Sequence, residues 1–62
     1  MTDPERDIVF HLVWAELAKL GACDDMGGME HARVHAEWIE AGRPEACDAF
    51  IRQRTNIGPY PA

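Results

Sequence analysis

Residues 2–21, TDPERDIVFHLVWAELAKLG, predict the helix around which the rest of the chain folds. Thr2 and Glu5 have the spacing of a capping box, in which the hydroxyl accepts from a free backbone amide and the carboxylate reaches back to the cap. Pro4 lies in the first turn, where a missing N–H costs no hydrogen bond, and Gly21 is typical of a helix end. At about 100° per residue, one apolar stripe forms the expected core face. Its members are Val9, Phe10, Val13, Trp14, Leu17 and Leu20.

A second apolar feature of this helix lies on its far side. Ile8 and Leu12 are about one turn apart and fall outside the core stripe. Their neighbours on that side are Ala15, Glu5, Glu16 and Lys19. Scattered exposed aliphatic side chains are common on proteins and need no function. A chain this small has too few residues to cover this side with another internal layer. Contact with another polypeptide is therefore the more specific hypothesis.

Two shorter helices are expected after the first. The second runs from about Met29 to Ala41, with Asp24 or Asp25 as its cap and Gly42 as its end. On its charged face, Arg33 is placed to pair with Glu30 and Glu37.

The third helix is expected to open at Arg43-Pro44-Glu45 and to run to about Arg54. Its apolar face is Ala46, Cys47, Phe50 and Ile51. The sequence therefore predicts an all-α domain of residues 1–54, an antiparallel helical hairpin with a short third helix across it. An irregular tail rich in Gly and Pro follows in residues 55–62, where Ile57 and Tyr60 could fold back on the core.

Length and charge limit what this domain does. The chain has 62 residues, and Leu, Ile, Val and Phe account for only 12 of them, so its core is small. Residues 1–31 contain 7 acidic and 2 basic side chains, which gives that half the whole net charge of −5. Direct binding to nucleic acid needs a basic stripe, and this chain lacks one. An acidic surface instead favours encounter with basic protein surfaces.

The location expected from the sequence is the cytoplasm. The acidic start does not resemble a secretory signal, and no run of residues is long and apolar enough to span a bilayer. Cys23 and Cys47 are 24 positions apart, which fits two reduced thiols better than a disulfide framework.

Catalytic chemistry has little support in the residue types present. The chain contains no Ser, and its hydroxyls at Thr2, Thr55 and Tyr60 lie in the cap and the tail, so a serine-type hydrolase is excluded. Cys47 on an apolar helix face is typical of a small buried hydrophobe rather than a nucleophile. We therefore expect neither an enzyme nor a cofactor.

The most specific pattern in the sequence is His31-x-x-x-His35, two imidazoles one helical turn apart. This spacing suits a shared metal ion, for which Cys23, His11 or Cys47 could complete the ligand set. The paired cysteines of a zinc knuckle and the catalytic HExxH form are both missing. The favoured interpretation is two histidines packed at a helix interface, each with a backbone or carboxylate partner. A pH-sensitive contact is a third possibility.

In size, acidity and helical content, the chain is similar to small phage and mobile-element proteins that inhibit a larger host complex, among them anti-CRISPR proteins. This resemblance implies a non-enzymatic inhibitor or adaptor that occludes a basic, nucleic-acid-binding surface of a protein partner. The expected contact residues are Ile8 and Leu12 as apolar anchors, with steering charge from Asp3, Asp7, Glu16, Asp24 and Asp25. Two alternatives stay open: a structural metal-binding module that uses His31, His35 and a Cys, and a homodimer formed through the Ile8 and Leu12 strip.

Overall fold

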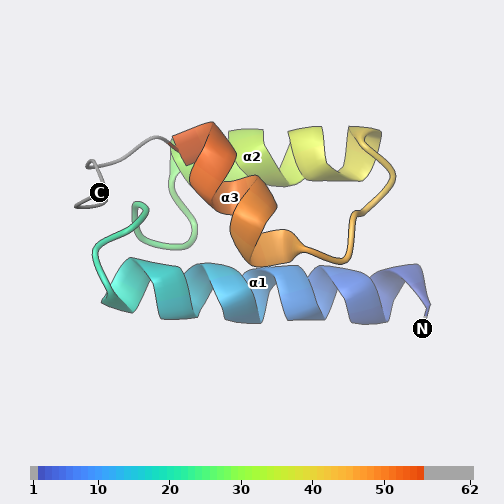
Figure 1. The fold of residues 1–62 in the computed structure, drawn as a ribbon, viewed down its shortest axis with the longest axis horizontal. Coiled ribbons are helices and arrows are strands. Elements are labelled where there is room, and N and C mark those ends of the chain that lie inside the picture. Colours follow the sequence, from blue (N-terminus) through green and yellow to red (C-terminus); the bar gives the residue numbers. More distant parts are fainter. Residues whose placement is uncertain (1, 56–62) are drawn as a thin grey trace.

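The computed structural model describes residues 2–55 and contains three helices in this range, α1 (Asp3–Lys19), α2 (Met29–Glu40) and α3 (Cys47–Thr55). Figure 1 shows α1 and α2 running antiparallel along the length of the molecule, with α3 lying across both. The predicted all-α hairpin with a crossing third helix is confirmed. The expected tail from residue 56 onward, with Ile57 and Tyr60, lies outside the described residues.

The ends of α1 follow the local signals in the sequence. Thr2 is the N-cap, and both halves of the capping box with Glu5 are present. Hydrogen bonding to Thr2 lowers the pKa of the Glu5 carboxyl. At the other end, Gly21 adopts a φ of +76°, a left-handed conformation that glycine takes without strain.

The core lies where the three helices meet, and α1 contributes Phe10, Trp14 and Leu17 to it. Val13 packs against this core from a partly buried position. Two members of the predicted stripe are not core residues: Val9 is 37% exposed and Leu20 is 74% exposed. Leu20 follows the last helical residue as the C-cap, beyond the length of α1 that the other helices cover.

Helix α2 agrees with the prediction in its extent but not in its cap. It buries Val34 and Trp38 and is followed by Gly42, which has a φ of +91°. Arg33 pairs with Glu37 at 3.1 Å, as the spacing predicts. The N-cap is Gly28, not Asp24 or Asp25, and no side chain caps the helix. Instead, the Gly28 amide donates to the backbone carbonyl of Asp25 at 3.3 Å.

Helix α3 begins at Cys47, so the prediction that Arg43-Pro44-Glu45 would open it is wrong. Arg43 has a φ of +53°, which places it in the left-handed region and outside a helix. The Pro44 carbonyl accepts a hydrogen bond from the Trp38 indole Nε1 at 2.9 Å. This segment is therefore an irregular connection, and the Trp38 indole joins it to α2. Within α3, Cys47, Phe50 and Ile51 are buried, whereas Ala46 precedes the helix and is exposed.

Candidate functional site

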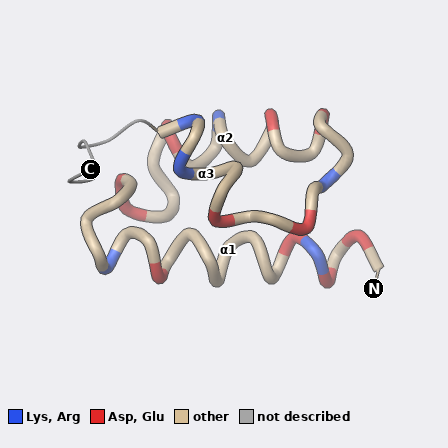
Figure 2. Tube along the Cα trace, viewed as in Figure 1, with Lys and Arg blue, Asp and Glu red and all other residues tan. Residues whose placement is uncertain are grey.

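The outer side of α1 presents the two apolar side chains that the sequence singles out. Ile8 is 57% exposed and Leu12 is 62% exposed. They lie one turn apart on a helix whose opposite side is buried in the core. Figure 2 shows that the middle of α1 carries no Lys, Arg, Asp or Glu, and residues 8–15 form this stretch. We call Ile8 and Leu12 the outer strip.

Two of the predicted steering charges are engaged within the protein. Asp7 accepts a hydrogen bond from Arg43 Nε at 3.1 Å, and this contact lowers the pKa of the Asp7 carboxyl. Asp3 lies 3.5 Å from Arg43 Nη1. Both aspartates therefore face the connection between α2 and α3 rather than the outer strip. Because Arg43 compensates their charge, they contribute less to the field on the outer side of α1.

The other three predicted steering charges, Glu16, Asp24 and Asp25, are exposed. Glu16 lies 4.0 Å from Lys19, and both side chains are highly exposed, so this pair contributes little to stability. Asp24 and Asp25 are exposed in the loop between α1 and α2. These three carboxylates lie toward the C-terminal end of α1, which Figure 1 places at the opposite end of the molecule from the N-terminus.

Additional exposed apolar side chains lie at the loop end of the molecule, and the sequence analysis did not select them. Leu20, Met26 and Met29 are all largely exposed. Met26 lies in the loop beside Gly27, where no helical periodicity marks an inward or outward direction, and Met29 is the first residue of α2. Their position beside Asp24 and Asp25 in the sequence is the signal that could have identified them.

The histidines predicted on α2 meet a third histidine from α1. His11 Nδ1 lies 2.9 Å from His31 Nε2, and the His11 and His35 ring centroids are 4.6 Å apart. His31 Nδ1 accepts from the Gly27 amide at 3.1 Å, and His35 Nε2 lies 3.6 Å from Asp7 Oδ1. The favoured interpretation places two histidines at a helix interface, each with a backbone or carboxylate partner. Both lie at this interface and His31 has its backbone partner, but the buried His35 Nε2 has no hydrogen-bond partner. We call these three residues the histidine cluster.

Metal binding through these histidines has no support in the described chain. Within residues 2–55, no group of three or more His, Cys, Asp or Glu side chains is arranged to hold a metal ion. Cys23 and Cys47 are free thiols, and both are buried. Burial and nearby carboxylates raise the pKa of Cys23 to about 11. Burial likewise raises the pKa of Cys47, so burial disfavours the thiolate form at both positions.

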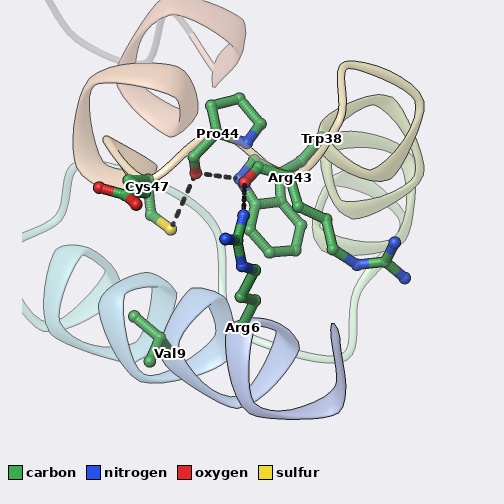
Figure 3. A pocket seen from close by; sticks show the side chains of 7 residues that line it. Arg6, Val9, Trp38, Arg43, Pro44 and Cys47 are labelled. Carbon is green, nitrogen blue, oxygen red and sulfur yellow. Dashed lines mark hydrogen bonds between the residues drawn. The ribbon is translucent and has the colours of Figure 1, made fainter. Parts of the chain in front are cut away.

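A pocket of about 250 Å³ lies between the first half of α1 and the connection that leads to α3. Figure 3 shows Val9, Trp38, Pro44 and Cys47 around it, with the guanidinium of Arg6 directed toward the backbone of Arg43. Arg6 Nη1 donates to the Arg43 carbonyl at 3.4 Å. Sequence reasoning missed this pocket because its walls come from three separate segments. The exposure of Val9 is explained by its position there.

Comparison with protein families, with curated proteins and with solved structures finds no match to this chain. Among the helices of residues 2–55, none combines the length and the apolar character needed to cross a membrane. Any function must therefore be argued from the surfaces and clusters described above.

Proposed function

We propose that this chain is a non-enzymatic protein that binds another protein through the outer strip of α1. The observation that carries the proposal is the exposure of Ile8 and Leu12, at 57% and 62%, on a stretch of helix without charged residues. Apolar side chains grouped in this way lose contact with water when a partner covers them, which favours association.

The charge distribution indicates the kind of partner. The first half of the chain holds the whole net charge of −5, and Glu16, Asp24 and Asp25 keep their carboxylates exposed. A basic or mixed basic and apolar surface complements this arrangement, because opposite charges speed encounter and set orientation. Proteins that bind nucleic acid present such basic surfaces. We therefore favour an inhibitor or adaptor that occludes a nucleic-acid-binding surface in the cytoplasm, a role also suggested by the resemblance to small phage inhibitors.

The experiment begins with capture of the partner from the native host, followed by binding measurements with purified components. The double variant Ile8→Asp/Leu12→Asp should lose association while circular dichroism retains the helical signal. Met29→Asp is the matched control, because Met29 is 91% exposed, lies outside α1 and begins α2, where an acidic residue suits the helix dipole. Binding that survives in the double variant, or that fails equally in the control, would contradict the outer strip as the contact surface.

Self-association through the same strip is the second candidate, favoured by the same exposed residues. Sedimentation of the purified chain separates the two candidates. A dimer that the double variant converts to a monomer would replace a foreign partner with a second copy of the chain.

A further inference from the structure

All three histidines of the chain meet between α1 and α2. His11 and His31 are joined by a contact of 2.9 Å between Nδ1 and Nε2. The His31 and His35 rings lie nearly parallel, at 7°, with centroids 6.1 Å apart. Phe10, Trp14 and Trp38 pack on the same rings, so the cluster is continuous with the aromatic core.

The hydrogen bonds assign a proton position to two of the rings. The Gly27 amide donates to His31 Nδ1, so this nitrogen carries no proton. Neutral His31 must then carry its proton on Nε2, and it donates that proton to His11 Nδ1. His11 in turn carries its proton on Nε2. The chain of bonds from Gly27 through His31 to His11 is thus complete when both imidazoles are neutral.

An added proton breaks this chain. If His31 takes up the proton, the proton occupies Nδ1 and faces the N–H of Gly27. If His11 takes it up, the proton occupies Nδ1 and faces the Nε2–H of His31. Each case places two donors against each other and removes a hydrogen bond. A second positive ring would also lie within about 4.6 to 6.1 Å of the first, at a partly buried interface where repulsion is poorly screened.

The charged groups near the cluster only partly compensate for the lost hydrogen bond and the repulsion between protonated rings. From α1, Asp7 Oδ1 lies 3.6 Å from His35 Nε2, and its negative charge opposes the lowering of the His11 pKa. The same oxygen accepts from Arg43 Nε, on the connection between α2 and α3, at 3.1 Å. On α2 and α3, Glu37 and Arg54 pair with each other at 3.1 Å. The buried Nε2 of His35 has no hydrogen-bond partner.

We propose that the histidine cluster is a proton-sensitive contact that holds α1 against α2 near neutral pH and releases it as the pH falls. Release separates the aromatic rings that pack on the histidines and so loosens the core. Burial lowers the pKa of both His11 and His31 below 6.5, and their neighbouring imidazoles act in the same direction. The unfolded chain therefore binds more protons than the folded chain in this range. The free energy of unfolding therefore decreases as the pH falls below about 6.5. The decrease ends once the pH is below the pKa values that His11 and His31 have in the folded chain.

The direct test is long-range ¹H–¹⁵N spectroscopy of the wild-type chain, in which every imidazole signal belongs to the cluster. Near neutral pH, we expect the Nε2–H tautomer for His11 and His31. On acidification, both should titrate below 6.5, together with a loss of the near-ultraviolet circular dichroism of the two tryptophans. The melting temperature should fall as the pH falls through this range, because the unfolded chain binds more protons than the folded chain. Titration of both rings at or above 6.5, or a melting temperature unchanged down to about pH 5, would overturn the proposal.

A variant distinguishes destabilisation caused by protonation of the cluster from destabilisation caused by protonation of other groups. His11→Asn places an amide oxygen near the position of Nδ1, where it accepts from His31 but does not titrate. We expect a melting temperature that depends less on pH between about pH 7.5 and pH 5 than in the wild type. Asp25→Asn, in the exposed loop, should keep the full dependence. An unaltered dependence in a folded His11→Asn would count against the proposal, and if this variant does not fold, the wild-type titration decides.

Discussion

Arg43 Nε donates to Asp7 Oδ1 at 3.1 Å, across 36 positions of sequence. This bond joins the first half of α1 to the connection between α2 and α3. Arg43 adopts a φ of +53° there, a conformation that is uncommon for a residue with a side chain. The carboxylates of Asp7 and Asp3 offset that local strain, because both lie within ion-pair distance of the Arg43 guanidinium.

Removal of the Asp7 charge should therefore destabilise the fold. Asp7→Asn keeps the size of the side chain but weakens its charge-assisted hydrogen bond to Arg43, so we expect a lower melting temperature. The loss should shrink at high salt, because mobile ions screen the pair. Thermal unfolding followed by circular dichroism measures both effects. Asp25→Asn serves as control, since it removes the same charge from an exposed loop. Equal losses in the two variants would show that net charge, not the Arg43 contact, is responsible.

A matched pair of isoleucines distinguishes the core from the outer strip. Ile51 has no exposed surface, whereas Ile8 is 57% exposed. Ile51→Ala leaves a cavity where the three helices meet and should cost about 2 to 5 kcal/mol, enough to unfold much of a domain this small. Ile8→Ala should change the free energy of unfolding by less than about 0.5 kcal/mol. Urea denaturation measures both values. A large loss in Ile8→Ala would mean that the outer strip supports the fold rather than a partner.

Sequence reasoning succeeded where the signals are local. The cap at Thr2 and Glu5 and the stop at Gly21 act within a few residues, so their positions in the sequence determine α1 almost completely. The exposure of Ile8 and Leu12 also follows from helical periodicity alone.

The same reasoning failed where tertiary contacts decide the backbone. Pro44 resembles a helix start, but its carbonyl is bound by the Trp38 indole, and Arg43 is held in a left-handed conformation by contacts to α1. The sequence shows only that Asp7 is an acidic residue in the first turns of α1. Its contacts with Arg43 and His35 depend on the fold. The spacing of His31 and His35 indicated a shared face, while the direct contact with His11 depends on how the hairpin closes.

The cap of α1 provides a third prediction. Thr2→Ala removes the hydroxyl that accepts from the Glu5 amide at 3.4 Å, and this change should cost about 0.5 to 2 kcal/mol. Thr2→Ser is the matched control, because it retains the hydroxyl and the capping box. Guanidinium denaturation of the three proteins gives the comparison. If serine and alanine destabilise the chain equally, the hydroxyl of Thr2 does not hold the helix end.

The buried thiols provide a prediction at alkaline pH. With a pKa of about 11, Cys23 is almost wholly protonated at pH 8, so Ellman's reagent should modify the folded chain about 100-fold or more slowly than the chain in denaturing urea. Because the pKa is raised in the folded state, the protonated thiol contributes stability that is complete below its ordinary value of 9.0 and is lost as the pH rises toward about 11. The melting temperature should therefore fall across this interval, and less steeply in Cys23→Ala. Fast modification of the folded chain at pH 8, at the rate of the denatured chain, would contradict the burial of Cys23 and the raised pKa of its thiol.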